Sequence, residues 1–231
     1  MRTDLSSMIR KRKEEKLNPV VAEIKVHSPK FGDLLGKRDP IEILKTYESC
    51  RVAGISYITE RKHFKGDFEL FKRICKLSHL PVLRKDFVTS KVEIERTAEA
   101  EADAVLLIAR ILKDKTAEFV DFALEHGLES VVEVHSEKEV EFAVETNTPI
   151  IGINNRDISK LEKDGGSVEV TKKLAKLIPR RFVRISESGI ANLNDLKIAL
   201  SYADAALVGT AFMKADRVED VVRSFVEAKL C

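Results

Sequence analysis

Several charged side chains suited to proton transfer follow short apolar runs along this chain. Glu23 and Lys25 end one run, Lys85 ends another, and Glu133 and Glu187 end two more. A lysine can donate a proton and a glutamate can accept one, so the set offers both an acid and a base. Each residue alone is best explained as a solvated residue at a strand end. Together they predict a catalytic site, because such charges are costly to gather unless they pair.

Small residues at two later positions predict a place for an anion. Ser188-Gly189 follows one apolar run, and Gly209-Thr210 follows the next and begins a short helical stretch. Free backbone N–H groups at such a start can bind a phosphate. A Gly-Thr pair alone is an ordinary turn, so the phosphate interpretation depends on the two pairs being neighbours in space. Ser28, after the first run, offers a further hydroxyl.

The elements that carry these residues alternate between strands and helices. Aliphatic and β-branched runs recur, and the segments between them place charged residues at helical spacing. The predicted strands are 20–25, 56–59, 81–85, 104–108, 130–134, 150–154, 182–186 and 205–208. The clearest predicted helices are 40–53, 91–101, 113–125, 137–146 and 192–201. This alternation implies parallel strands joined by right-handed crossovers.

A closed (β/α)8 barrel is the fold that this pattern favours. Such a barrel needs roughly 200–250 residues, and the chain has 231. An open doubly wound sheet usually has fewer strands and a glycine-rich first turn, which is missing after Lys25. We therefore expect one domain over 1–231, an α/β TIM barrel with an extra N-terminal helix. The extension 1–19 would either cover the bottom of the barrel or contact substrate.

Side-chain alternation decides which residues meet at the carboxyl ends of the strands. Glu23 and Lys25 share one face of the first strand. On the third strand Leu83 and Lys85 face the interior, whereas Arg84 faces the helix layer. The charged residues should therefore converge in the mouth of the barrel.

Composition limits the partners and the compartment. The chain has 40 Lys+Arg against 38 Asp+Glu residues, a net charge of +2 that argues against a nucleic-acid partner. Its three cysteines lack the spacing of a zinc site or a disulfide framework. No apolar run approaches the roughly 20 residues of a membrane span, and the basic N-terminus lacks the apolar stretch of a secretory signal. We expect a cytoplasmic protein with no membrane partner; no oligomeric state is indicated.

Seven short motifs lie along nearly the whole chain from residue 20. They are AEIKVHSP (22–29), RDPIEI (38–43), LRKDF (83–87), VVEVH (131–135), GINNRD (152–157), SESGI (186–190) and LVGTAFM (207–213). In this order they resemble the indole-3-glycerol phosphate synthase family, (β/α)8 enzymes that close the indole ring in tryptophan biosynthesis. The motifs together are highly specific, although any one alone would not be.

The resemblance implies roles for the charged residues at the strand ends. Lys85 would be the general acid and Glu133 the general base. Lys25 would be a cation for the substrate carboxylate and for ring closure, and Glu23 would hold the lysines. Glu187 would contact the reacting centre of the substrate.

The resemblance also implies the residues that bind the substrate. Asn154 would contact substrate hydroxyls, and Arg156 would be an ion-pair partner. Phosphate would be bound by Ser28, Ser188, Gly189, Gly209 and Thr210. The anthranilate ring would be surrounded by Leu83, Phe87, Leu106 and Ile158. The sequence departs from the family after strand one, where Lys30 and Phe31 follow Ser28-Pro29 in place of Ser-Pro-Ser.

The implied substrate is 1-(2-carboxyphenylamino)-1-deoxyribulose 5-phosphate, a phosphorylated small molecule. Ring closure with loss of CO2 and water needs an acid, a cation and a base, but no metal or redox cofactor. A second phosphate-binding barrel enzyme, phosphoribosylanthranilate isomerase, could share the phosphate site but would not need Lys25, Lys85 and Glu133. A noncatalytic phosphosugar-binding barrel is a third hypothesis.

Overall fold

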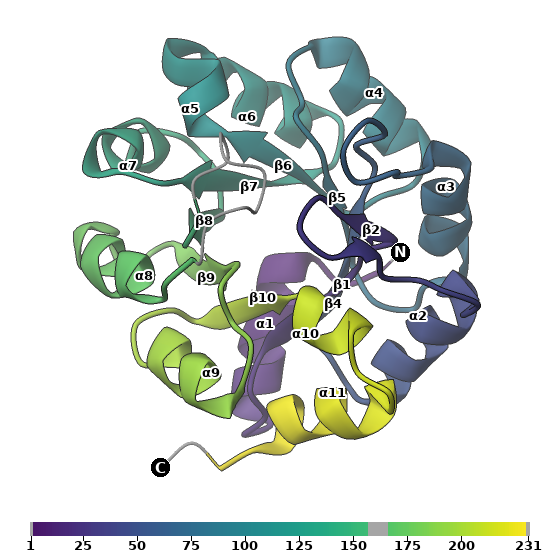
Figure 1. Ribbon diagram of the computed structural model, residues 1–231. Helices are drawn as coiled ribbons and strands as arrows, with labels where there is room; N and C mark the ends of the chain where they lie inside the picture. The colour runs from purple at the N-terminus through teal and green to yellow at the C-terminus, as the bar shows by residue number, and fades with distance from the viewer. Residues whose placement is uncertain (1, 157–165, 230–231) are drawn as a thin grey trace.

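The computed structural model is a closed barrel of parallel strands surrounded by helices (Figure 1). It describes residues 2–156 and 166–229. The strands follow one another around the barrel in chain order, and the last, β10, pairs with the first, β1. The predicted (β/α)8 barrel is therefore confirmed, and the open sheet is excluded.

The barrel strands agree closely with the predicted ones. They are β1 (Val20–Ile24), β4 (Gly54–Ile58), β5 (Val82–Lys85), β6 (Ala104–Ile108), β7 (Glu129–Val134), β8 (Ile150–Asn154), β9 (Val183–Glu187) and β10 (Ala205–Val208). No strand end differs from its prediction by more than two residues. The agreement arises because strands buried on both faces form nearly continuous apolar runs.

The helices pack around the strands as an outer ring (Figure 1). They are α2 (Pro40–Ser49), α3 (Phe68–Leu77), α4 (Lys91–Glu99), α5 (Ala109–Leu112), α6 (Thr116–Glu125), α7 (Glu137–Val144), α8 (Glu169–Leu174), α9 (Leu193–Leu200), α10 (Thr210–Met213) and α11 (Val218–Glu227), with 3-10 turns at η1 (Lys113–Lys115) and η3 (Ala175–Leu177). Three predicted helices, 40–53, 91–101 and 137–146, extend too far by two residues or more. In the first two the backbone becomes left-handed soon after the true end, with φ of 60° at Arg51 and 59° at Glu101.

Helix α1 (Leu5–Glu14) closes the amino-terminal end of the barrel. The Leu5 side chain lies against Gly54 at the start of β4. The backbone N–H and hydroxyl of Ser6 donate to the carboxylate of Glu129, the first residue of β7, at 2.9 and 2.5 Å. In Figure 1 α1 lies behind the strands, on the far side of the barrel. Of the two expectations for the extension, the structure supports a cover over the bottom.

A small hairpin lies over the opposite, open end of the barrel. Its strands are β2 (His27–Ser28) and β3 (Gly32–Asp33), and it lies on the near side in Figure 1. Phe31 in its turn packs beneath the ammonium of Lys214, which lies 4.4 Å from the ring centroid. The hairpin is thus linked to the segment after α10 at the barrel mouth.

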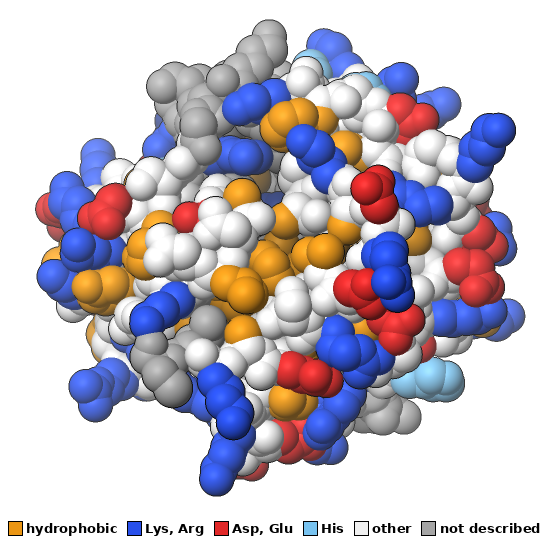
Figure 2. Space-filling view, turned by 60° about the horizontal axis from the view of Figure 1, so that its bottom comes forward, with side chains coloured by type: hydrophobic (Ala, Val, Ile, Leu, Met, Phe, Trp, Pro, Cys, Tyr) orange, Lys and Arg blue, Asp and Glu red, His pale blue; other side chains and the backbone are white. Residues whose placement is uncertain are grey.

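The surface mixes charges of both signs. In Figure 2 apolar side chains gather toward the middle of the face shown, and acidic and basic side chains are interspersed around them. Within the described parts of the chain, no helix is long and apolar enough to cross a membrane.

Leu5→Ala should lower the free energy of unfolding by about 2–5 kcal/mol, because Leu5 is fully buried and its removal leaves a cavity. Urea unfolding followed by circular dichroism measures the change. Leu77→Ala is the matched control, since Leu77 on α3 is about half exposed, and it should change stability by no more than about 0.5 kcal/mol. Equal losses in both variants would contradict the role of α1 as a packed cover.

Candidate active site

A cavity of about 420 Å³ opens at the carboxyl ends of the barrel strands. Most residues predicted for the site line it. They are Glu23, Lys25, Lys85, Phe87, Leu106, Glu133, Asn154, Arg156, Ser188, Gly189, Gly209 and Thr210. The convergence of polar strand ends that the sequence predicts is therefore present in the structure.

The ammonium of Lys85 lies between two buried carboxylates. Its Nζ is 3.1 Å from Glu133 Oε2 and 2.9 Å from Glu187 Oε2. Lys85 and Glu187 are the last residues of β5 and β9, and Glu133 is the last but one of β7; these are alternate strands of the barrel. Inward side chains of alternate strands share a layer in this fold, so closure of the barrel brings them together.

The charges of this cluster depend on one another. Burial opposes the charged form of Lys85, but the carboxylates of Glu133, Glu187 and Glu23 outweigh it and raise the pKa of the ammonium. Burial also opposes ionisation of Glu133, but Lys85 and His135 outweigh it and hold the pKa of Glu133 well below its usual range. At neutral pH the site therefore presents an ammonium and an ionised carboxylate in contact.

Glu187 differs from Glu133 although both contact the same ammonium. Burial is the largest influence on Glu187 and, despite the Lys85 charge, it raises the pKa of this carboxyl to about 7. Among the described residues Glu187 Oε1 has no hydrogen-bond partner. Two carboxyl groups with different proton affinities therefore contact one lysine.

Two glycines make room for carboxylates of neighbouring strands. A Cβ on Gly152 would overlap Glu187 Oε1, and a Cβ on Gly209 would overlap the carboxylate of Glu23. Gly209 was predicted only as a phosphate contact. The structure shows that it also provides space for Glu23, so a larger residue at 209 would disturb both.

Lys25 is fully enclosed at the mouth, and an aromatic ring covers it. Its Nζ lies 5.2 Å from the centroid of the Phe64 ring. The Glu60 carboxylate accepts hydrogen bonds from the backbone N–H groups of His63 and Phe64, at 2.7 and 2.9 Å, and so fixes the loop that carries the ring. Phe64 was not predicted as a site residue, because no periodic pattern marks a loop residue.

The turn after β9 has a strained backbone. Ser188 and Gly189 both have positive φ, at 65° and 72°, and a left-handed serine costs on the order of 1–3 kcal/mol. Asn155 Nδ2 donates to the Ser188 carbonyl at 2.9 Å and to Ser186 Oγ at 3.0 Å. Asn155, which was not predicted as a site residue, thus holds the predicted phosphate turn.

Two predicted binding residues, Leu83 and Ser28, are not in the cavity wall, and neither is Glu187, which lies behind it against Lys85. Leu83 is buried two residues before Lys85 on the same face, one layer deeper. Ser28 is fully buried, and its Oγ accepts a hydrogen bond from the backbone N–H of Lys30 at 3.2 Å. Ile158 lies outside the described residues. The contacts of these four with a substrate stay predictions.

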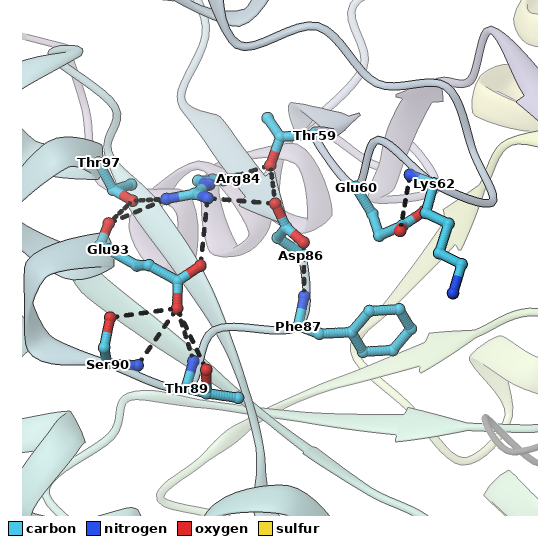
Figure 3. A network of polar contacts seen from close by, with 10 residues as sticks. All are labelled: Thr59, Glu60, Lys62, Arg84, Asp86, Phe87, Thr89, Ser90, Glu93 and Thr97. Atoms are coloured by element: carbon cyan, nitrogen blue, oxygen red, sulfur yellow. Dashed lines mark hydrogen bonds and ion pairs between the residues drawn. The ribbon is translucent and has the colours of Figure 1, made fainter.

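Arg84 faces the helix layer, as predicted (Figure 3). Its Nη1 donates to Thr97 Oγ1 on α4 at 2.9 Å, and its Nη2 lies 3.1 Å from Asp86 Oδ2. The other oxygen of Asp86 accepts from the Phe87 N–H at 2.8 Å. The ring of Phe87 points away from this network (Figure 3). The network therefore anchors the turn that follows Lys85.

Comparisons with known proteins identify relatives over almost the full length. The family model described as indole-3-glycerol phosphate synthase matches residues 2–225. Proteins named indole-3-glycerol phosphate synthase from Pyrococcus abyssi and Pyrococcus furiosus are 62% and 60% identical, over 93% and 98% of both chains. One from Methanocaldococcus jannaschii is 38% identical over 96% of this chain and 82% of its own. A tryptophan synthase alpha chain from Legionella pneumophila shares the fold, with a TM-score of 0.68 at 11% identity over 96% of this chain and 95% of that one.

Gly152→Ala should displace the Glu187 carboxylate from Lys85, because the new methyl group would occupy the position of Glu187 Oε1. A crystal structure of the variant should show a longer distance between Lys85 Nζ and Glu187 Oε2. Ile151→Val, at a neighbouring position that packs on the helix side of β8, should leave this distance unchanged. An unmoved carboxylate in Gly152→Ala would show that the backbone yields instead.

Proposed function

The chain belongs to the indole-3-glycerol phosphate synthase family, and from this premise we propose which of its residues carry out the reaction. Enzymes of this family are decarboxylating lyases of tryptophan biosynthesis, and this chain is one of them. The reaction converts 1-(2-carboxyphenylamino)-1-deoxyribulose 5-phosphate to indole-3-glycerol phosphate. One observation carries the assignment of roles: the Lys85 ammonium lies between Glu133 and Glu187 at the cavity wall.

Lys85 is the general acid of the first step. As the aromatic carbon that bears the carboxylate bonds to the ketone carbon, the ketone oxygen gains negative charge and takes a proton from the ammonium. The raised pKa of Lys85 keeps it protonated until the substrate oxygen arrives. Lys25, also in the cavity wall, attracts the substrate carboxylate before it leaves as CO2.

Glu133 is the general base of the last step. Loss of the new hydroxyl group as water requires an ammonium of the cavity wall to protonate that hydroxyl, and a proton to leave the carbon beside the ring nitrogen. An ionised carboxylate in the cavity wall can accept this proton, and the lowered pKa of Glu133 keeps it ionised. Asn154 and Glu187 orient the substrate hydroxyls and the reacting centre.

The opposite side of the cavity wall receives the phosphate. Ser188, Gly189, Gly209 and Thr210 bind this anion, and Phe87 and Leu106 contact the anthranilate ring. The described cysteines, Cys50 and Cys75, are free and buried. This state suits a reducing compartment, and we place the enzyme in the cytoplasm.

An activity assay tests the function directly. Purified protein incubated with the substrate should produce indole absorbance and fluorescence, and the chain has no tryptophan to obscure the signal. An isomerase or a noncatalytic phosphosugar-binding barrel would form no indole from this substrate. Release of CO2 in equal amount with indole would exclude a side reaction.

Lys85→Ala and Glu133→Gln should each lower kcat by roughly 10²-fold or more with modest changes in KM, because both residues act on the chemical steps. Steady-state kinetics at saturating substrate measure the effect, and single-turnover rates establish that chemistry limits turnover. Lys72→Ala serves as a control, because Lys72 is an exposed lysine of α3 outside the cavity wall. Near wild-type kcat in both site variants would refute the assigned acid and base.

Lys25→Met should weaken both substrate affinity and turnover, because it removes a buried cation that faces the substrate carboxylate. Lys25→Arg should recover some binding but little turnover, since the guanidinium is larger and a poor proton donor. Unfolding curves of each variant must precede the kinetics, because the ammonium also contributes charge to the buried cluster. A folded Lys25→Met protein with normal kcat and KM would leave Lys25 a purely structural cation.

A further inference from the structure

An ionic chain continues behind Glu133 toward the protein surface. Glu133 Oε2 contacts Lys85, and its other oxygen, Oε1, lies 3.2 Å from Nε2 of His135. The second ring nitrogen, Nδ1, donates to Glu139 Oε2 at 3.0 Å. Glu139 Oε1 accepts from Arg110 Nε at 2.9 Å. Each oxygen of Glu133 therefore has its own basic partner.

The imidazole is held rigidly from the helix side. The side chain of His135 is only 3% exposed. Glu139, in the first turn of α7, also accepts hydrogen bonds from the backbone N–H of His135 at 2.7 Å and from Ser136 Oγ at 3.0 Å. Ser136 is the N-cap of α7. The start of the helix therefore fixes Glu139, and Glu139 fixes the ring that contacts Glu133.

We propose that His135 is a positioning residue that holds Glu133 in place and supplies a permanent positive charge beside it during the reaction. The inference rests on the proposed roles of Lys85 and Glu133. When Lys85 gives its proton to the substrate, Glu133 loses one of its two cationic partners. The imidazolium remains, so Glu133 stays ionised for the later step in which it takes a proton.

The surroundings of the ring favour its charged form. Burial opposes that form, but the carboxylates of Glu133 and Glu139 outweigh it and raise the pKa of His135 to about 9. Burial likewise opposes ionisation of Glu139, but His135 and Arg110 outweigh it and lower the pKa of Glu139 to about 2. The charged groups that face the ring are Glu133 on β7 and Glu139 on α7, with Arg110 on α5 behind Glu139. At pH 7 the ring is therefore an imidazolium between two carboxylates.

Histidine titration by NMR tests the charge directly. The chain has five histidines, and the signal missing from the His135→Asn spectrum identifies His135. Its ring nitrogens should remain those of an imidazolium up to pH 8 and titrate near pH 9. Glu133→Gln and Glu139→Gln should each shift this titration to lower pH. A neutral ring at pH 7 in the wild-type protein would overturn the proposal.

Kinetics then test the positioning role. His135→Asn should lower kcat by roughly tenfold or more with KM changed less than about twofold, as for other residues that orient a reacting group. Loss of the cation raises the pKa of Glu133, so the acid limb of the kcat profile should move to higher pH. A kcat loss with an unmoved pH profile would reduce His135 to a packing residue and overturn the proposal.

Glu139→Gln is a second variant that keeps the ring and a hydrogen-bond acceptor. Loss of the Glu139 charge lowers the pKa of His135, so the ring loses its own charge, and its hold on Glu133, at a lower pH. Activity should therefore begin to fall at a lower pH on the alkaline side than in the wild type. His126→Asn is the matched control, since His126 is exposed beyond α6 and contacts Phe122, and it should leave kcat and both limbs unchanged. An alkaline limb in Glu139→Gln that coincides with the wild type would contradict the proposal even if His135→Asn failed to fold.

The kinetics of the Lys85 and Glu133 variants and the titration of His135 test different roles. If Lys85→Ala and Glu133→Gln keep normal kcat, the assigned acid and base are wrong, regardless of how His135 titrates. If those variants lose kcat but the His135 titration is the same in wild type and Glu133→Gln, the assigned roles stand and the proposal for His135 is wrong.

Discussion

The structure depends on the burial of an ammonium between two carboxylates at the mouth of the barrel. Taking Lys85, Glu133 and Glu187 out of water is costly, and the cost is offset only if the three groups stay in contact. A closed barrel meets this requirement because β5, β7 and β9 deliver the side chains from fixed positions around one ring. The backbone must also leave space for them, and Gly152 provides it beside Glu187.

One end of the barrel contributes stability, and the other forms the cavity. At the amino-terminal end α1 packs Leu5 into the core and caps β7 through Ser6 and Glu129, which contributes stability. At the carboxyl end the residues are polar, some of the backbone is strained, as at Ser188, and the cavity remains open. A strained, charged mouth is tolerated because the remainder of the barrel is densely apolar.

The sequence allowed the strands, the closed barrel and most of the cavity wall to be predicted, because period-two alternation specifies which side chains face inward. It predicted less where segments distant in the chain determine the structure. Phe64 reaches Lys25 from a loop, and Asn155 holds Ser188 across two strands. His135 could have been found, since it shares the face of Glu133 and is followed by a serine and a glutamate spaced for a helix start. The ends of α2 and α4 could not, because the left-handed residues just beyond them, Arg51 and Glu101, are not of a type that marks such a turn.

A general base must be ionised before it acts and must then bind a proton firmly. The arrangement around Glu133 meets both requirements. A carboxylate held ionised by a neighbouring ammonium is a weak base, because the same charge that lowers its pKa lowers its proton affinity. In the proposed reaction Lys85 becomes neutral before Glu133 is needed, so the proton affinity of Glu133 rises after the acid step. His135 limits that rise and, being enclosed by Glu139 and the start of α7, keeps the carboxylate in place. Glu187, among the described residues, forms its ion pair with Lys85 alone. The second cation is therefore what distinguishes the base from the other carboxylate on the same lysine.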